Sequence, residues 1–403
     1  MTEHPSFLRQ LPPEEKKRLA YIEGREDLFQ TKVFEIKNGA EPQAEGEKEN
    51  ILVISRDPGS AGALAPVMEL LHHDDTIIMR VLTDGRAEEI LEKEFPMNDI
   101  TPQDMTLGAD QVLGTPDVLL VNSSVSEKGL ETYAVATYPE VPMILVEDYY
   151  TSSLGFLQRL KERKLSYPKK ICVLDSEAKN IIVKEFPELE GSIEITGQPA
   201  FDRFATEDTE GLKTDARREL SMMPDEKIIT FVSASMGTDI KLVEKMADEL
   251  KKVKAKFRIA FTVHPRDNTP RETYQKIFRE AGIACINVGQ LGFNKVGAAS
   301  DVVVMIISTE GLNAIYRRKP TVHITDPRFV VPLKGLTPPP PVTLGASVGL
   351  DDVNGLADTV AELLDPESAK NAELRKHMEQ NYPVDGKNAQ RVADLLMAEM
   401  AKN

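Results

Sequence analysis

The sequence predicts an α/β protein with two Rossmann-like, doubly wound parallel-sheet domains that follow one another along the chain. Short apolar runs of about four to six residues alternate with amphipathic helical segments, a pattern typical of parallel strands covered by helices on both faces. This alternation stops near residue 205 and starts again near residue 225. The length of 403 residues also fits two large domains.

The first domain is expected over residues 49–205, after a polar N-terminal extension at 1–48 that we predict to be helical and to end in a linker. Within this domain, each apolar run is followed by a small-residue turn or by an amphipathic stretch, as βαβ units require. The strands are expected at residues 51–55, 76–83, 116–124, 142–150 and 169–176.

The second domain is expected over residues 225–350. The charged segment 206–224 before it holds one short helical pattern but otherwise lacks an apolar period, so we predict an interdomain linker there. Helical stretches within 351–403 close the chain. The strands of this domain are expected at residues 227–235, 257–265, 284–290, 301–309 and 319–326.

Charge and cysteine content exclude several classes of protein. Sixty-five acidic side chains against 49 basic ones give a net charge of −16, which argues against a general nucleic-acid binder. The cysteines, Cys172 and Cys285, lie inside apolar runs, and no metal-ligand spacing of Cys or His occurs, so we predict structural thiols and no metal site. No apolar stretch has the length of a signal peptide core or a membrane helix, which predicts a soluble, cytoplasmic protein.

Candidate ligand-binding residues follow the predicted strands, because ligands of open parallel sheets bind beyond the carboxyl ends of the strands. Ser308 and Thr309 follow an apolar run and begin a helix, whose free N–H groups and dipole suit a diphosphate. Gly311 would let a backbone or a phosphate approach closely. A plain N-cap is the alternative interpretation of these hydroxyl groups.

Two further loops of the second domain follow the strands at 227–235 and 257–265. His264 and Arg266 are a pair that can face a phosphate, and the alternative is a surface turn in which Arg266 pairs with a neighbouring acid. Ser235, Gly237 and Thr238 form a small-residue loop that can line a ligand. This loop has no Walker or GxGxxG spacing, so an ordinary turn is the alternative.

In the first domain, carboxylates follow two of the strands. Asp57 and Ser60 come after the first strand, where either residue can cap the next helix and Asp57 can instead act as a general base. Glu147 and Asp148 hold the equivalent position after a later strand. The sequence does not separate Asp57, Glu147 and Asp148 as candidates for the base.

A basic cluster lies just beyond these carboxylates in an otherwise acidic chain. It is interpreted either as a solvated helix face or as a patch for an anionic acceptor or a phospholipid surface. Its members are Arg159, Lys161, Arg163, Lys164, Lys169 and Lys170.

Four segments together resemble GT-B-fold proteins. Residues 308–314 with Lys319-Pro320 are similar to the S-T-x-G-x-E-A…K-P segment of capsule-polysaccharide and CDP-glycerol-transferase-like enzymes. His264-Pro265 resembles the HP pair of these enzymes and of the non-hydrolysing UDP-GlcNAc 2-epimerases. TGQPAFD at 196–202 is similar to a TGxPxxD segment near the domain junction, and DPGSAGALAPV at 57–67 resembles a glycine-bearing first loop.

The resemblance implies two domains facing a cleft, with the last helix crossing back to the first domain. It implies acceptor binding near Gly59 and Ser60, and a nucleotide base near Val288. Asn313 stands where the related enzymes have a ribose-binding glutamate. The residues that would surround the nucleotide-sugar diphosphate are Ser235, Gly237, Thr238, His264, Arg266, Ser308, Thr309 and Gly311.

The function implied is that of a glycosyltransferase that moves a sugar or polyol-phosphate unit from a UDP- or CDP-linked donor to a glycan or lipid-linked acceptor, without a metal or other cofactor. Asp57 or Asp148 would take the proton of the acceptor, and His264 would help to stabilise the leaving diphosphate. Contact with the inner membrane surface would use residues 159–170. A UDP-sugar 2-epimerase and a non-catalytic nucleotide- or glycan-binding module are the alternatives.

Overall fold

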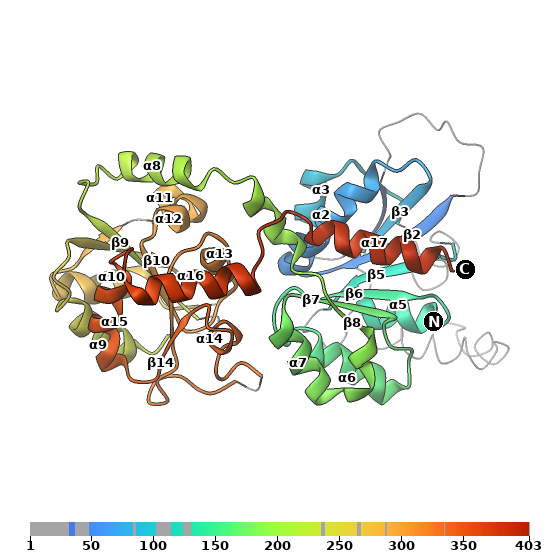
Figure 1. Cartoon of the computed structure of the whole chain (residues 1–403). Coiled ribbons are helices and arrows are strands. Elements are labelled where there is room, and N and C mark those ends of the chain that lie inside the picture. Colours follow the sequence, from blue (N-terminus) through green and yellow to red (C-terminus); the bar gives the residue numbers. More distant parts are fainter. Residues whose placement is uncertain are drawn as a thin grey trace, which may run out of the picture. The chain divides into compact units, whose positions relative to one another are not determined.

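The chain forms two compact units, seen in a computed structural model (Figure 1). Unit 1 comprises residues 1–202 and 387–403, and unit 2 comprises residues 203–386. The structure describes residues 32–36, 48–83, 86–101, 114–123, 130–234, 238–263, 267–286, 288–333 and 335–402.

Unit 1 contains an eight-stranded sheet in its described part, with the order β4-β1-β3-β2-β5-β6-β7-β8. The six neighbouring strands β3-β2-β5-β6-β7-β8 run parallel, whereas β1 pairs antiparallel with both β3 and β4. The strands are β1 (Lys32–Ile36), β2 (Glu49–Ser55), β3 (Ile77–Thr83), β4 (Met97–Asp99), β5 (Val118–Asn122), β6 (Met143–Val146), β7 (Lys170–Val173) and β8 (Ile193–Ile195).

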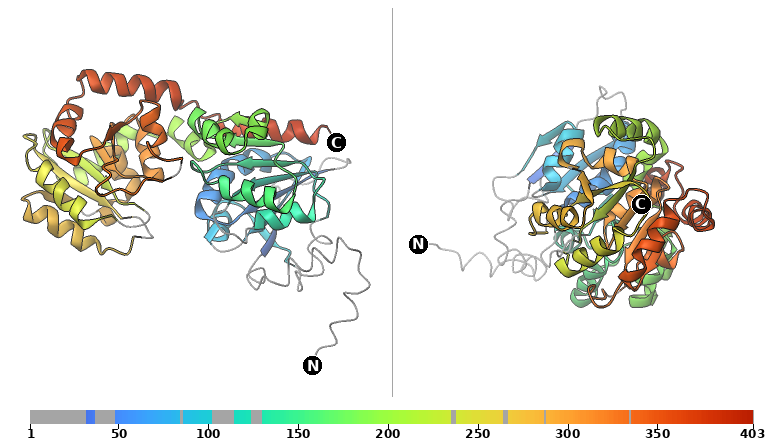
Figure 2. Two further views of the ribbon diagram at one scale, coloured as in Figure 1. Left: turned by 90° about the horizontal axis from the view of Figure 1, so that it is seen from below. Right: turned by 90° about the vertical axis from the view of Figure 1, so that its left-hand side faces the viewer.

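Helices cover both faces of this sheet (Figures 1 and 2). Helices α2, α3 and α17 share one hydrophobic core with the strands, and α17 packs along α2. Helices α5, α6 and α7 lie on the other side of the sheet. The helices of unit 1 are α2 (Pro58–His72), α3 (Arg86–Glu94), α5 (Leu130–Thr137), α6 (Leu154–Arg163), α7 (Ser176–Glu185), η2 (Pro187–Ser192), η3 (Pro199–Ala205, ending in unit 2) and α17 (Asn388–Met400).

Unit 2 contains a six-stranded parallel sheet in the residues that are described, ordered β11-β10-β9-β12-β13-β14. Its strands are β9 (Lys227–Val232), β10 (Phe257–Thr262), β11 (Ala284–Ile286), β12 (Val302–Met305), β13 (Thr321–Ile324) and β14 (Val348–Leu350). Its helices are α8 (Thr209–Glu219), α9 (Ile240–Leu250), α10 (Arg271–Glu280), α11 (Val288–Leu291), α12 (Phe293–Ala299), α13 (Thr309–Tyr316), α14 (Pro340–Thr343), η4 (Val353–Gly355), α15 (Leu356–Leu363) and α16 (Ala369–Asn381).

The prediction of a helical extension over residues 1–48 is wrong at strand β1, which lies within that range. Val33, Phe34 and Ile36 are buried, and the strand adds an antiparallel edge to the sheet of unit 1. The apolar run in KVFEI is short and is interrupted by Glu35, so within a polar region it did not stand out as a strand. Residues 1–31 and 37–47 lie outside the described residues.

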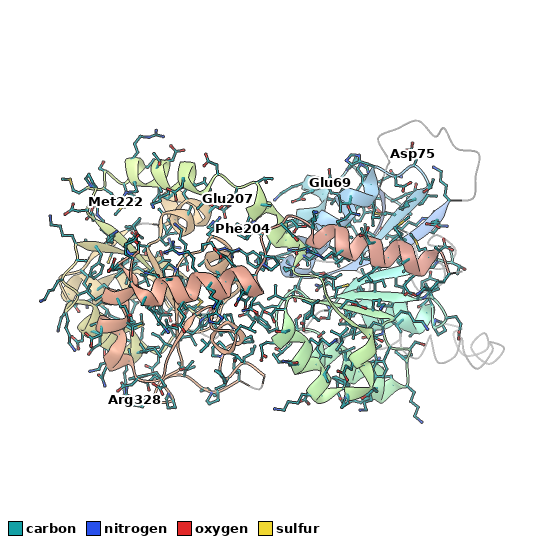
Figure 3. The ribbon with its side chains drawn as sticks, viewed as in Figure 1. Glu69, Asp75, Phe204, Glu207, Met222 and Arg328 are labelled. Carbon is teal, nitrogen blue, oxygen red and sulfur yellow. The ribbon has the colours of Figure 1, made fainter. Side chains whose placement is uncertain are left out.

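The segment predicted as a linker, 206–224, is instead part of unit 2. Helix α8 packs on α12, and Ala216 lies in a core cluster with Val296 and Ala299, against which Met222 also packs. Figure 3 labels Glu207 and Met222 at the two ends of this helix. The apolar residues of α8 are few and widely spaced, so the sequence pattern understated their burial.

The other predicted boundaries differ in detail. Of the helices within 351–403, α15 and α16 belong to unit 2, and only α17 belongs to unit 1. The strand predicted at 284–290 ends at Ile286, and α11 begins at Val288.

The TGQPAFD segment, 196–202, anchors α17 within unit 1. The Asp202 carboxylate accepts hydrogen bonds from the backbone N–H groups of Asn388 (2.9 Å) and Ala389 (2.7 Å) at the start of that helix. Gly197 has φ +78°, and a Cβ there would lie 2.2 Å from Asn388 Oδ1. Glycine is therefore required at 197 both by the left-handed backbone and by the close approach of α17.

Candidate functional site

Among the parallel strands of each sheet the strand order reverses at one point, which is where ligands of open α/β sheets bind. In unit 1 the reversal falls between β2 and β5, and in unit 2 it falls between β9 and β12. The loops that follow these strands carry several of the predicted residues. The two regions are described separately, one for each unit.

Glu147 follows β6 in unit 1 and is buried, with 2% of its surface exposed. One carboxyl oxygen, Oε1, accepts a hydrogen bond from the Ser153 hydroxyl at 2.7 Å. The other oxygen, Oε2, is buried and receives no hydrogen bond from a described residue. Burial raises the pKa of Glu147 to about 8, so this carboxyl group holds its proton at neutral pH.

Asp148 lies beside Glu147, and its Oδ1 is likewise buried without a hydrogen bond from the described residues. Burial raises the pKa of Asp148, and the nearby Asp57 carboxylate adds to the rise. The Gln198 side chain donates to the backbone carbonyl of Asp148 at 2.8 Å and fixes this turn. Unit 1 therefore holds two adjacent carboxyl groups with raised pKa values, which is a common property of acid–base sites.

The start of α2 accommodates the Asp148 carboxylate. A Cβ at Gly59 would lie only 2.4 Å from Asp148 Oδ2, so glycine at this position leaves room for that carboxylate. Asp57 is the N-cap residue of α2, but its side chain makes no capping hydrogen bond. Ser60 is buried and its hydroxyl lies 3.0 Å from that of Ser55. The structure thus groups the predicted residues Asp57, Gly59 and Asp148.

Asn122 and Ser123, at the end of β5, are site residues that the sequence analysis missed. Asn122 Nδ2 donates to the carbonyl of Val146 at 2.6 Å, which ties β5 to the residue before Glu147. Asn122 Oδ1 and Ser123 Oγ are buried without a hydrogen bond from a described residue. The signal available was the change from VLLV to polar residues at a strand exit, the same signal that selected Glu147 and Asp148.

In unit 2, Ser308 is the N-cap of α13, and its hydroxyl accepts from the Glu310 N–H at 3.2 Å. Thr309 is exposed. A Cβ at Gly311 would lie 2.1 Å from Met305 Sδ, so glycine at this position allows α13 to pack on β12. The helix start that was predicted to bind a diphosphate is formed, with the serine acting as its cap.

Asn313 is buried one turn into α13, where two charged residues hold its amide group. Its Oδ1 accepts from Arg203 Nη2 at 3.2 Å, and its Nδ2 donates to Glu310 Oε2 at 2.6 Å. Burial raises the pKa of Glu310 against the opposing effects of Asn313 and Arg203. A carboxylate is therefore present on the first turn of α13, although position 313 itself carries an amide. No ligand-binding role was predicted for Glu310 or Arg203.

Of the remaining predicted residues of unit 2, the structure describes Thr238 and Val288. Thr238 is buried, and its hydroxyl accepts from the Ala234 N–H at 3.3 Å. Val288 is buried in the core at the start of α11 rather than in a strand. Ser235, Gly237, His264 and Arg266 lie outside the described residues.

The basic cluster at 159–170 is largely neutralised by acids of unit 1. Arg159 pairs with the buried Glu131 at 3.1 Å, Lys161 with Glu188 at 3.4 Å, and Lys170 with Glu194 at 2.6 Å. These pairs favour the interpretation as an ordinary helix face. Across the described ranges, every helix is too short or too polar to cross a bilayer.

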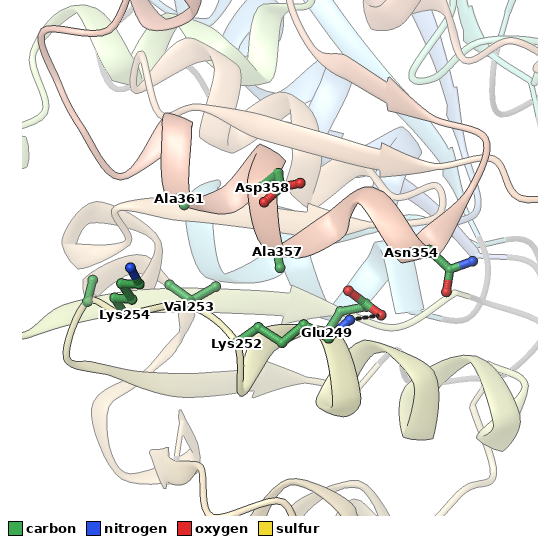
Figure 4. Close-up of a pocket in the computed structure, with 9 residues that line it drawn as sticks. Glu249, Lys252, Val253, Lys254, Asn354, Ala357, Asp358 and Ala361 are labelled. Carbon is green, nitrogen blue, oxygen red and sulfur yellow. Dashed lines mark hydrogen bonds and ion pairs between the residues drawn. The ribbon is translucent and has the colours of Figure 1, made fainter.

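A groove of about 450 Å³ lies between the end of α9 and α15 in unit 2 (Figure 4). Its wall includes the buried Glu249, which pairs with Lys252 at 2.6 Å. None of the described residues in the loops that follow β9, β10 and β12 lines it. This groove is separate from the candidate nucleotide region.

Comparison with solved structures identifies the fold. A UDP-GlcNAc 2-epimerase from Neisseria meningitidis bound to UDP-GlcNAc has a TM-score of 0.61 at 15% identity, covering 87% of this chain and 100% of that chain. The S. aureus MnaA–UDP structure has a TM-score of 0.62 at 16% identity, covering 88% of this chain and 97% of the other.

A structure of the wall teichoic acid polymerase TagF with CDPG has a TM-score of 0.52 at 13% identity, covering 96% of this chain and 94% of that chain. No protein-family model and no curated protein matches the sequence. The predicted fold class is confirmed: the chain has the GT-B fold, with two Rossmann-like domains.

Proposed function

We propose that this protein is a nucleotide-sugar-dependent enzyme that transfers a sugar or polyol-phosphate unit from a UDP- or CDP-linked donor to a glycan or lipid-linked acceptor. The observation that carries the proposal is the pair of the buried Glu147 and the partly buried Asp148, which follow β6, the strand next to the reversal between β2 and β5. Each has a carboxyl oxygen that no described residue binds. Solved structures of the same fold with UDP-GlcNAc, UDP and CDPG support a nucleotide-linked substrate.

In this proposal, unit 2 holds the donor and unit 1 supplies the base. The N–H groups and dipole at the start of α13 bind the diphosphate beside Ser308. The Glu310 carboxylate accepts hydrogen bonds from hydroxyl groups of the ribose.

Asp148 takes the proton of the acceptor hydroxyl as its oxygen attacks the activated atom of the donor. For a sugar, the bond between the sugar carbon and the diphosphate breaks and a nucleoside diphosphate leaves with the electron pair. For a polyol phosphate, the attack falls on the distal phosphorus, the bond to the bridging oxygen of the diphosphate breaks, and a nucleoside monophosphate leaves with the electron pair. The raised pKa makes Asp148 a stronger base than an exposed aspartate.

One observation favours a UDP-sugar 2-epimerase as a second candidate. Glu147 keeps its proton at neutral pH while Asp148 beside it is available as a base, and chemistry that removes and returns a proton uses such a pair. Of the solved structures above, the one from Neisseria meningitidis is named as a UDP-GlcNAc 2-epimerase, and the S. aureus MnaA structure contains UDP. Conversion of a UDP-sugar without any acceptor would favour this candidate, and nucleotide release that requires an acceptor would favour the transferase.

Nucleotide binding is expected at the start of α13. UDP or CDP should raise the melting temperature of the wild type, and Ser308→Ala should weaken that binding about tenfold, equivalent to ~1.4 kcal/mol, because the anion site loses its cap. Ser368→Ala is the matched control: Ser368 also caps a helix of unit 2, with its hydroxyl accepting from the Asn371 N–H at 3.2 Å. A nucleotide shift that is equal in both variants would contradict the placement, and no shift with any nucleotide would contradict the proposed function.

Asp148→Asn should lower turnover about 100-fold or more while leaving the nucleotide-induced melting shift unchanged, because the amide cannot take a proton. Turnover is measured as nucleotide release, with and without acceptor. Asparagine has nearly the same shape, so the turn held by Gln198 is expected to persist. Equal loss of nucleotide binding and turnover would mean that Asp148 acts through the fold and not as the base.

A further inference from the structure

Lys319, the lysine of the Lys319-Pro320 pair, is a nearly buried amine that the proposed function does not use. It lies between the end of α13 and the start of β13, with 9% of its surface exposed. Its ammonium group forms no hydrogen bond or ion pair with a described residue. A buried ammonium group without an acceptor is costly, so such a side chain tends to lose its proton or to gain an anionic group.

This amine lies at the edge of the unit 2 sheet that is opposite to the candidate nucleotide region. Lys319 comes just before the first residue of β13, as Asp301 comes just before the first residue of β12. Ser308 and the other predicted nucleotide-binding loops follow the carboxyl ends of the strands instead. Because this sheet is parallel, its amino and carboxyl edges are separated by the length of the strands. A role for Lys319 is therefore separate from nucleotide binding and goes beyond the proposed function.

The charges with the largest effects on Lys319 come from elements packed around it. Lys213 on α8 and Arg317 at the end of α13 repel the ammonium form, whereas Glu210 on α8 and Asp301 before β12 attract it. Burial, followed by the smaller effect of Lys213, lowers the pKa of Lys319 to about 8. Part of this side chain is therefore a neutral, nucleophilic amine near neutral pH.

Both acids near Lys319 already have other partners. Glu210 pairs with Lys213 at 3.8 Å, and the Glu210 side chain is 79% exposed, so solvent screens its charge. Asp301 Oδ2 accepts from the Ile228 N–H at 2.8 Å, and Asp301 Oδ1 lies 3.7 Å from Lys227 Nζ. These acids therefore stabilise the Lys319 ammonium only weakly.

Arg317, in contrast, has a donor left for an anion. Its Nε and Nη2 donate to Glu207, while its Nη1 is buried without a hydrogen bond to a described residue. An unpaired buried donor is costly, and a new acceptor nearby would relieve that cost. An anionic group on Lys319 would be attracted by Arg317 and Lys213, the two cations that repel its ammonium form.

We propose that Lys319 is a carbamylation site, at which its neutral amine adds carbon dioxide. The amine nitrogen attacks the carbon of carbon dioxide, an N–C bond forms, and the electron pair of one C–O π bond moves to that oxygen. The nitrogen then loses a proton to water, so the lysine becomes a carbamate anion beside Lys213 and Arg317. Carbon dioxide is small enough to reach a side chain with so little exposed surface, and the reaction needs no leaving group.

The test is carbon-13 NMR of the full chain equilibrated with carbon-13-labelled carbon dioxide at a fixed pressure. The wild type should show a carbamate resonance that is lost in Lys319→Met. At low occupancy this resonance should grow at least about fivefold from about pH 7 to about pH 8, because the neutral fraction of the amine rises by that factor. Lys213→Met should weaken it at least about threefold, because one cation beside the carbamate is lost.

Lys170→Met is the matched control, because Lys170 is a partly buried lysine whose Nζ already lies 2.6 Å from Glu194. The terminal α-amino group and exposed lysines also add carbon dioxide, but their resonances should persist in Lys319→Met. Lys319→Arg keeps the charge without the reactive amine, so it preserves the test if Lys319→Met fails to fold. The inference would be overturned if the wild type showed no carbamate, if both Lys319 variants kept every resonance, or if Lys213→Met left the Lys319 resonance unchanged.

Discussion

Glu147→Gln should stabilise the protein relative to wild type increasingly as pH rises from about 5 to about 9, by on the order of 4 kcal/mol in total. The pKa of Glu147 is about 8 in the folded protein, against 4.5 as its ordinary value. Between these values the folded state holds a proton that the unfolded state has lost, so wild-type stability falls as pH rises through this window. Glutamine has no proton to lose, and other titrating groups cancel in the difference between the two proteins.

The measurement is urea denaturation of both proteins across this pH range. Glu249→Gln is the matched control, because Glu249 is equally buried at 2% exposure but pairs with Lys252 at 2.6 Å. This control measures what the change from a carboxyl to an amide group costs at a buried position where a lysine lies beside it. A flat difference for Glu147→Gln would show that Glu147 is ionised in the folded protein and would remove its assignment as a proton donor.

The alternation of strands and helices was predictable because apolar runs in a parallel sheet are nearly continuous, and both sheets carry such runs. Strand β1 escaped prediction because Val33, Phe34 and Ile36 form only a short, interrupted apolar run within a polar region. A short helical pattern was predicted where α8 lies, but its packing in unit 2 was not, because Ala216 is the one buried residue of that helix and a small apolar side chain gives little periodic signal.

The sequence could predict which loops carry the candidate site, because the carboxyl ends of the parallel strands lie together at one edge of the sheet. Glu147 and Asp148 were named on that basis, but their burial and raised pKa values depend on packing that no local pattern encodes. Asn122 and Ser123 were missed because polar residues after a strand usually belong to an ordinary turn. The packing requirement for Gly311 was not predicted, because it comes from Met305 on β12 and not from a local pattern.

Arg317→Met should destabilise unit 2 by about 3–5 kcal/mol, because it leaves a partly buried carboxylate without its partner. The Arg317 side chain is fully buried and makes two hydrogen bonds of 2.6 Å to Glu207, just before α8. It also lies over the ring of Phe204, with its Cζ 4.9 Å from the ring centroid. These contacts tie the chain entering unit 2, where Figure 3 labels Phe204 and Glu207, to the end of α13.

A double variant separates the charge effect from packing. Adding Glu207→Gln to Arg317→Met removes the uncompensated charge and should recover most of the lost stability, because replacing both members of a buried pair is nearly neutral. The control is Arg218→Met, which breaks a pair with Asp215 of the same 2.6 Å length but on an exposed face, and should cost less than about 1 kcal/mol. Urea denaturation of all variants measures these differences. Equal losses in Arg317→Met and the double variant would mean that packing against Phe204, rather than the ion pair, holds this segment to α13.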